Sequence, residues 1–231
     1  MSLDISRIQA LCFDMDGTLC DTDDQMVSHL EKWIRWFTFL FPGGNSRAVA
    51  RWLVMAMENP GTYMHGLSDQ LYLDHHIANL SDGLYKLKPS RGINSLPPLI
   101  PGVKEMLLCL RNHFPMALVS VRGRPSTVSF LEYHELDLFF HTVVTGQTCL
   151  HTKPYPDPIL WAASQIGIPP SLCLMIGDTT VDILAGKAAG AQTIGVLCGF
   201  GEREELSLAG ADLILQTTAD LHEVFQVCEC F

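Results

Sequence analysis

Two aspartates separated by a single residue, Asp14 and Asp16, directly follow an apolar run and directly precede a glycine. Side chains alternate along a strand, so residues i and i+2 project the same way where a strand ends. Two carboxylates about 4 Å apart repel by about 4 kcal/mol at an effective dielectric of about 20, unless a cation or a shared proton compensates. Gly17 and Thr18 allow a tight turn whose N–H groups face outward. The segment therefore predicts a site for a divalent cation together with a phosphate.

Three structural explanations compete with a functional one for these acids. Acid-rich turns are common after strands. An EF-hand loop also begins with this pattern, but with Asp14 as its first ligand the required glycine falls on Leu19, so the frame fails. Asp21 or Thr22 can cap the next helix, and that role is compatible with a nearby site. The motif therefore needs support from the rest of the chain.

Further polar residues follow other apolar runs. Ser120 follows Leu118-Val119 and can donate its hydroxyl to a phosphate oxygen. Lys153 precedes a proline-rich stretch and can neutralise a phosphate or orient a carboxylate, although a solvated surface lysine is the alternative. Asp178 and Asp182 lie one helical turn apart after another apolar run, so both can reach one cation or simply cap a helix.

These residues require a scaffold that gathers strand ends at one edge. Short β-branched or apolar runs alternate with helical patterns, which predicts right-handed βαβ crossovers and a doubly wound parallel sheet of the α/β class. Ligands in such sheets bind at the carboxyl ends of the strands. The predicted strands span residues 8–13, 116–120, 142–145, 173–177, 193–196 and 212–215, and the predicted helices 103–111, 126–135, 157–165, 181–189, 202–209 and 219–227.

One region interrupts this alternation. Residues 22–98 show no convincing strand, and their pattern is helical up to a linker rich in Pro, Ser and Gly. We therefore predict a core domain formed by residues 1–21 and 99–231, with an all-helical cap domain and linker inserted at 22–98 that can close over the strand ends. Trp33, Trp36 and Trp52 fall in the insertion, where they can form its core or contact a substrate.

Composition narrows the classes of partner. The chain has 231 residues, is 48% hydrophobic and carries a net charge of −10, which disfavours nucleic acid and anionic membranes and favours a small molecule. No stretch is apolar and long enough to span a bilayer, and the N-terminus lacks a signal-peptide pattern. Eight cysteines fall mostly within apolar runs, which favours a reducing cytoplasm. The Cys228-Glu229-Cys230 sequence is only a weak metal-binding signal.

The motifs DMDGTL, Ser120, Lys153 with its prolines, and GDTTVD occur in the order and approximate spacing of the four motifs of the haloacid dehalogenase superfamily. The chain resembles the phosphatase members of that superfamily along essentially its whole length. The insertion after the first motif resembles their helical cap of the first type, and GVLCGFGEREEL resembles the tail of phosphoglycolate-phosphatase-like proteins.

The resemblance implies roles for these residues. Asp14 is expected to attack phosphorus and form an aspartyl-phosphate, while Asp16 protonates the leaving oxygen and later accepts a proton from water. Mg²⁺ is expected to bind Asp14, the backbone carbonyl of Asp16, and Asp178, with Asp182 supporting the ion or the lysine.

Substrate binding is expected at Gly17, Thr18, Ser120 and Lys153, which would hold the phosphoryl oxygens. Arg122 departs from the small or amide residue that often follows the second motif. It can contact substrate or the cap, or it can be exposed to solvent.

The sequence therefore predicts a Mg²⁺-dependent phosphatase acting on a small phosphorylated metabolite, such as phosphoglycolate or a sugar phosphate, as a cytoplasmic monomer or homodimer. A phosphomutase of the β-phosphoglucomutase type is the first alternative, and a non-catalytic binding protein on the same fold is the second. A dehalogenase is disfavoured because a halide leaving group needs no proton from Asp16.

Overall fold

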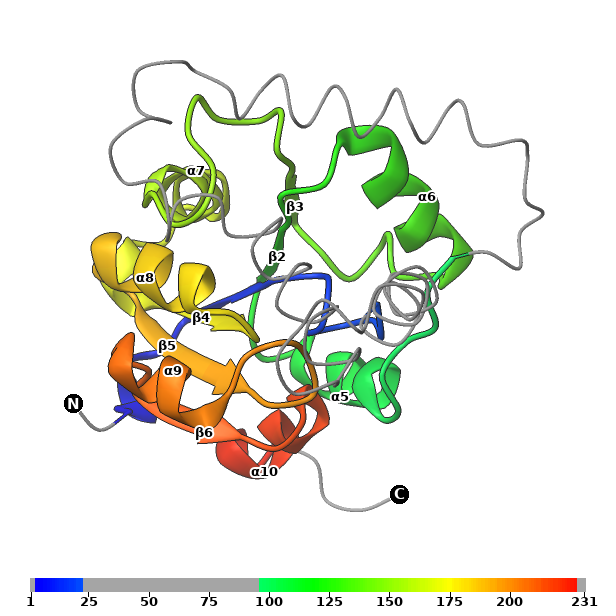
Figure 1. The fold of residues 1–231 in the computed structure, drawn as a ribbon. Helices are drawn as coiled ribbons and strands as arrows, with labels where there is room; N and C mark the ends of the chain where they lie inside the picture. The colour runs from blue at the N-terminus through cyan, green and yellow to red at the C-terminus, as the bar shows by residue number, and fades with distance from the viewer. Residues whose placement is uncertain (1–2, 23–95, 228–231) are drawn as a thin grey trace, which may run out of the picture.

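Six short strands form one sheet in the computed structural model, which describes residues 3–22 and 96–227 (Figure 1). The order across the sheet is β3-β2-β1-β4-β5-β6, and every neighbouring pair is parallel. All six strands were predicted from the sequence, so the α/β class and the parallel sheet are confirmed. The strands are β1 (Ala10–Phe13), β2 (Met116–Val119), β3 (Thr142–Val144), β4 (Cys173–Gly177), β5 (Gln192–Val196) and β6 (Leu213–Leu215).

The described helices also match the predicted ones, with small shifts at their ends. The main difference is the start of α6, which begins at Arg124 rather than Ser126, because Pro125 is tolerated in the first helical turn. The α-helices are α5 (Val103–Leu110), α6 (Arg124–Tyr133), α7 (Asp157–Ile166), α8 (Thr180–Ala188), α9 (Arg203–Leu208) and α10 (Leu221–Phe225). Short 3-10 turns cover Ile5–Arg7, Pro170–Leu172 and Thr218–Asp220.

Helices cover both faces of the sheet, and the alternation of side chains along β1 shows how (Figure 1). Leu11 and Phe13 belong to a cluster that includes the buried face of α5, whereas Ala10 and Cys12 belong to a second cluster with α7. All four side chains are fully buried. A central parallel strand buried on both faces therefore appears in the sequence as a continuous apolar run.

The sheet reverses its winding direction at β1. The chain passes from β1 to β2 and β3 on one side, and then crosses to β4 on the other side. The loops that follow β1 and β4 therefore diverge from each other, and ligands in open parallel sheets bind at such a point, beyond the carboxyl ends of the strands. Asp14 and Asp178 directly follow these two strands, so the topology places them together.

The predicted helical cap with its tryptophans lies almost wholly outside the described residues. Its two flanks, however, run side by side. The Asp21 N–H donates to the Pro98 carbonyl at 2.9 Å, and the Ile100 N–H donates to the Leu19 carbonyl at 3.0 Å. The chain therefore leaves the sheet after β1 and returns to it at the same place, next to the turn that contains Asp16.

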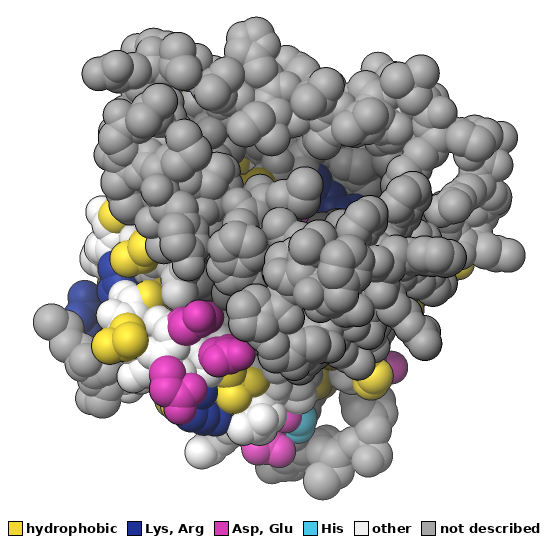
Figure 2. All heavy atoms as spheres, in the orientation of Figure 1, with side chains coloured by type: hydrophobic (Ala, Val, Ile, Leu, Met, Phe, Trp, Pro, Cys, Tyr) yellow, Lys and Arg dark blue, Asp and Glu magenta, His cyan; other side chains and the backbone are white. Residues whose placement is uncertain are grey.

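Acidic side chains gather at the lower left of Figure 2, in the region of β6 and α9, where Glu202 and Glu204 are exposed.

Within the described ranges, no helix is both long and apolar enough to cross a membrane. Five described cysteines are free thiols, and Cys109 is disulfide-bonded. The Cys228–Cys230 pair lies outside the described residues.

Candidate active site

Asp14 lies at the first position after β1, and its backbone remains attached to the sheet. Its N–H donates to the carbonyl of Ile176 in β4 at 2.9 Å, which fixes the direction of the side chain. The residue is 6% exposed, and its Oδ1 atom accepts a hydrogen bond from Lys153 Nζ at 2.6 Å. This short charged contact holds the carboxylate in one orientation at the carboxyl end of β1.

Lys153 lies in the loop between β3 and α7, with its ammonium group buried beneath the acids. Nζ donates to Asp14 Oδ1 and Asp182 Oδ1, both at 2.6 Å, and to the carbonyl of Val119 at 3.0 Å. Burial alone would lower the pKa of the lysine, but the two carboxylates outweigh it and raise the pKa of Lys153 above its usual value. The ammonium therefore stays charged and bridges the ends of β1 and α8. The alternative of a solvated surface lysine is excluded.

Asp182, in the first turn of α8, orients Lys153. Its Oδ1 atom accepts from Nζ, and its Oδ2 atom accepts from the Thr179 N–H at 3.0 Å and from the Thr179 hydroxyl at 2.6 Å. Both carboxylate oxygens are therefore engaged with protein groups. This pattern suits a residue that holds the lysine in place, and it also caps the helix.

Asp178 directly follows β4 and is held on both oxygens. Oδ1 accepts from the Thr18 hydroxyl at 3.0 Å, and Oδ2 accepts from the Phe200 N–H at 2.8 Å. Two glycines make room for it. A Cβ atom on Gly17, whose φ is +72°, would lie 2.2 Å from Asp178 Oδ2, and one on Gly199 would lie 2.1 Å from the same atom. Only glycine fits such a close approach.

Gly199 and Phe200 had no assigned role from the sequence. They belong to the GFG segment after β5, the strand next to β4, and this adjacency is a signal that could have placed them near Asp178. The segment supplies both the space and the hydrogen bond that fix the carboxylate.

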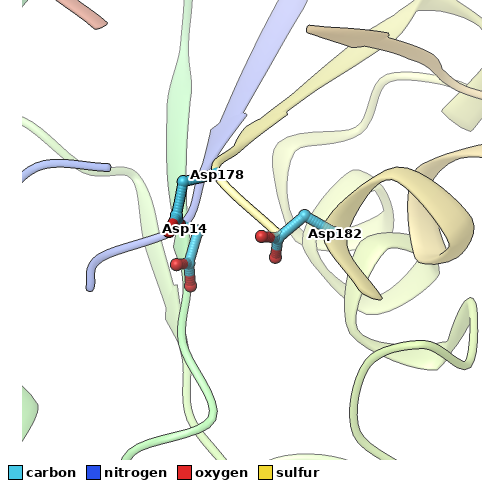
Figure 3. A group of neighbouring side chains, drawn as sticks. All are labelled: Asp14, Asp178 and Asp182. Carbon is cyan, nitrogen blue, oxygen red and sulfur yellow. The ribbon is translucent and has the colours of Figure 1, made fainter. Parts of the chain in front are cut away.

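The three acids converge on one small region (Figure 3). One carboxylate oxygen from each of Asp14, Asp178 and Asp182 lies within 4.8 Å of the other two, and all three residues are buried. Burial raises the pKa of Asp14 to about 7, with Lys153 opposing the shift and Asp182 and Asp16 adding to it. A buried, oxygen-only set of this kind fits a hard divalent cation such as Mg²⁺. The residues present therefore fit the predicted ion.

The Asp16 side chain forms an ion pair with Arg122. Arg122 Nε donates to Asp16 Oδ2 at 2.6 Å, and Nη2 donates to Oδ1 at 2.5 Å. The thiol of Cys20 lies 3.8 Å from Oδ1. The sequence offered substrate contact, cap contact or exposure for Arg122, and did not anticipate this ion pair. The Asp16 backbone carbonyl as a metal ligand, and Asp16 as the proton donor, remain predictions.

The remaining predicted binding residues lie in the loops that follow β1 and β2. Ser120 is buried after β2, and its Oγ atom accepts from the Arg122 N–H at 3.1 Å. The Gly17 N–H donates within its own turn to the carbonyl of Cys20 at 2.9 Å, and the Thr18 hydroxyl is committed to Asp178. The described contacts of Gly17 and Thr18 therefore shape the turn and Asp178, and phosphate binding by these two residues remains a prediction.

Known proteins with related sequences match nearly the whole length of this chain. Residues 11–196 match the model of the family described as haloacid dehalogenase-like hydrolase. A phosphoglycolate phosphatase from Photorhabdus laumondii is 28% identical over 223 residues, covering 94% of this chain and 92% of that protein. One from Escherichia coli K12 is 26% identical over 235 residues, covering 93% and 91%. Pyrophosphatase PpaX from Bacillus pumilus is 26% identical over 222 residues, covering 94% and 95%.

Solved structures share the fold. The haloacid dehalogenase-like protein SP0104 from Streptococcus pneumoniae aligns with a TM-score of 0.70 at 22% identity, covering 96% of this chain and 100% of that one. A Thermotoga maritima protein provisionally described as a β-phosphoglucomutase aligns with a TM-score of 0.61 at 19% identity, covering 95% and 99%. The chain therefore belongs to the haloacid dehalogenase-like hydrolase family, as the order of its four motifs predicted.

Proposed function

We propose that this enzyme is a Mg²⁺-dependent phosphatase that hydrolyses a small phosphomonoester through an aspartyl-phosphate on Asp14. The observation that carries the proposal is the Lys153 ammonium bridging Asp14 and Asp182 beside Asp178, at the point where the sheet reverses direction. Membership of a hydrolase family whose curated relatives here are phosphatases supports the same reaction.

The first step is the transfer of the phosphoryl group to the protein. An oxygen of Asp14 forms a bond to phosphorus while the bond from phosphorus to the ester oxygen breaks, and Asp16 gives its proton to the departing alkoxide. Lys153 orients Asp14 for this attack, and Asp182 keeps Lys153 in place. Ser120 then contacts the phosphoryl oxygens, and the charged Lys153 ammonium beside Asp14 offsets their negative charge.

The second step restores the enzyme. Water attacks the phosphorus of the aspartyl-phosphate, its proton passes to Asp16, and the bond between phosphorus and the Asp14 oxygen breaks. The products are the alcohol and inorganic phosphate. Asp14, Asp178 and the Asp16 backbone carbonyl would hold Mg²⁺, which would supply positive charge that offsets the repulsion between nucleophile and phosphate.

The test compares phosphate release from an aryl phosphate with Mg²⁺ by wild type, Asp14→Asn and Asp137→Asn. Asp137 is an exposed acid on the described surface, so its variant controls for the loss of one negative charge. We expect wild type and Asp137→Asn to release phosphate alike, and Asp14→Asn or added chelator to reduce release to background. Equal background release from all the proteins would refute an enzyme and favour a binding protein.

The substrate is tested with a panel. We propose a small phosphorylated metabolite, and the names of the relatives make phosphoglycolate and pyrophosphate the first compounds to include, followed by sugar phosphates. A phosphomutase remains the second candidate, because its aspartyl-phosphate must be protected from water. Steady release of inorganic phosphate from simple monoesters would exclude it.

Residues 22–98 are proposed to form the cap that covers the substrate, since the flanks of this segment meet beside the Asp16 turn. Deleting the cap tests this assignment. A core with residues 23–95 replaced by a short linker should keep its sheet but accept larger phosphoesters. We further propose that the protein is cytoplasmic and has no nucleic-acid partner. We also propose that it is a monomer or homodimer, and sedimentation measures this oligomeric state directly.

A further inference from the structure

The ion pair between Arg122 and Asp16 has a geometry with consequences for catalysis. Two guanidinium nitrogens meet two carboxylate oxygens, at 2.6 Å and 2.5 Å, in the side-by-side arrangement that gives the strongest arginine–carboxylate contacts. Both oxygens of Asp16 are therefore engaged by Arg122. While the pair is intact, the carboxyl group of Asp16 is held toward Arg122 and cannot turn to the leaving group of a substrate.

The backbones of both partners are fixed, so only the side chains can rearrange. The Arg122 N–H donates to Ser120 Oγ at 3.1 Å, and its carbonyl accepts from the Gly146 N–H at 2.9 Å. Asp16 forms a β-bridge with Cys20 inside the tight turn. The side chains of Arg122 and Asp16 are 28% and 16% exposed, so solvent and an incoming ligand can reach the pair.

The location of the guanidinium makes it a counter-ion for phosphate. Arg122 lies two residues beyond Ser120 and next to the ends of β1 and β2, where the proposed function places the phosphoryl group. Lys153 already directs its ammonium donors at Asp14, Asp182 and Val119. A phosphoryl dianion offers the same pair of acceptor oxygens as a carboxylate, and therefore competes with Asp16 for the same guanidinium.

We propose that Arg122 is a positioning residue that passes from Asp16 to the phosphoryl group when substrate binds. In the resting enzyme, Arg122 holds Asp16 away from the reaction. On binding, the phosphoryl oxygens take the guanidinium, and Asp16 is released, takes up a proton from solvent and reaches the leaving oxygen. The inference rests on the proposed function, because that function supplies the role of Asp16, and it makes phosphate binding the trigger that completes the active site.

Inorganic phosphate binding in the presence of Mg²⁺ tests this exchange without turnover. Calorimetry compares wild type, Asp16→Asn, Arg122→Gln and the double variant. Removing the Asp16 carboxylate removes a competitor for the Arg122 guanidinium, so Asp16→Asn should bind phosphate more tightly than wild type. The loss of the negative charge at position 16 also strengthens phosphate binding when Arg122 is absent. Comparing the double variant with Arg122→Gln measures this contribution by itself. We expect the gain in phosphate affinity caused by Asp16→Asn to be about tenfold larger with Arg122 present than without it.

Equal gains in both backgrounds would overturn the proposal, as would the absence of phosphate binding in all four proteins. A measurement on unaltered protein guards against misfolded variants. The ¹⁵N–¹H signal of Arg122 Nε, identified by its loss in Arg122→Lys, should shift when phosphate and Mg²⁺ are added, and an unchanged signal would refute the exchange. These readouts need no hydrolysis. If the wild type releases no phosphate but the affinity gain from Asp16→Asn still depends on Arg122, the phosphatase proposal is refuted and the exchange between Asp16 and phosphate stands.

Discussion

Replacing Lys153 by methionine removes the single positive charge that joins Asp14 and Asp182, while keeping a chain of similar length. The lysine side chain is 3% exposed, and the two carboxylates are 9% and 1% exposed. The substitution therefore leaves two buried acids without their shared partner. The affected quantity is the free energy of unfolding of the metal-free protein.

The magnitude follows from the distances. Each 2.6 Å contact is worth about 6 kcal/mol at an effective dielectric of about 20, before the cost of desolvating the ions. Without the lysine, carboxylate oxygens within 4.8 Å of each other repel by about 3.5 kcal/mol at the same dielectric. Removing one partner of a buried pair costs about 3–5 kcal/mol in measured cases. We therefore expect Lys153→Met to lose about 3–5 kcal/mol.

Urea unfolding in chelator at pH 8 measures this loss. Lys104→Met is the matched control, because Lys104 pairs at the surface with Glu135, and we expect it to lose less than about 1 kcal/mol. Adding Asp182→Asn to Lys153→Met should restore about half of the loss, since one of the two repelling charges disappears. A loss below about 1 kcal/mol for Lys153→Met, or no recovery in the double variant, would refute this account of the buried charges.

The sign of the pH dependence follows from Asp14. A carboxyl whose pKa is higher in the folded protein than in the unfolded chain takes up a proton on folding, so its contribution to stability is greatest at low pH and is lost as the pH rises through its folded pKa. The pKa of Asp14 is raised to about 7. The destabilisation of Lys153→Met should therefore be smaller at pH 5.5 than at pH 8, because a protonated Asp14 no longer repels Asp182.

Two further predictions concern the ion. Gly199→Ala forces a Cβ atom to 2.1 Å from Asp178 Oδ2 and disturbs its bond to the Phe200 N–H, so Mg²⁺ affinity measured by activity titration should fall by about 10–100-fold. Gly190→Ala, at a positive φ with open space around it, should leave this affinity unchanged, and equal effects of both variants would contradict the role of Gly199. Because the pKa of Asp14 is raised to about 7, a proton competes with the ion, and Mn²⁺ affinity measured by calorimetry should fall by about tenfold per pH unit below 7. Identical Mn²⁺ affinities at pH 6 and pH 8 would rule out this competition.

The sheet and the positions of its strand ends were predictable because each depends on local sequence. Continuous apolar runs such as residues 173–177 are typical of strands buried on both faces, and the helices between them require parallel pairing. Once the sheet is parallel, polar residues that follow different strands must gather at one edge. Asp14, Ser120 and Asp178 follow β1, β2 and β4 in this way, although the roles given to them remain predictions.

Contacts that depend on side-chain direction between distant loops were not predictable. Arg122 and Asp16 are 106 residues apart, and nothing in either motif indicates that one side chain faces the other. The position of Gly199 against Asp178 depends on how the loop after β5 folds back, which the local pattern of a glycine pair does not specify. The engagement of both Asp182 oxygens likewise emerges only once α8 and the Lys153 loop are placed.

Covalent trapping tests the central claim, the aspartyl-phosphate on Asp14, most directly. Enzyme mixed with substrate and Mg²⁺ is quenched within one turnover, reduced with borohydride and digested. Reduction converts an aspartyl-phosphate to homoserine, which peptide mass spectrometry locates. We predict homoserine at position 14 only in samples that received substrate. Hydrolysis of substrate with aspartate unchanged at position 14, or with homoserine at another aspartate, would contradict the account.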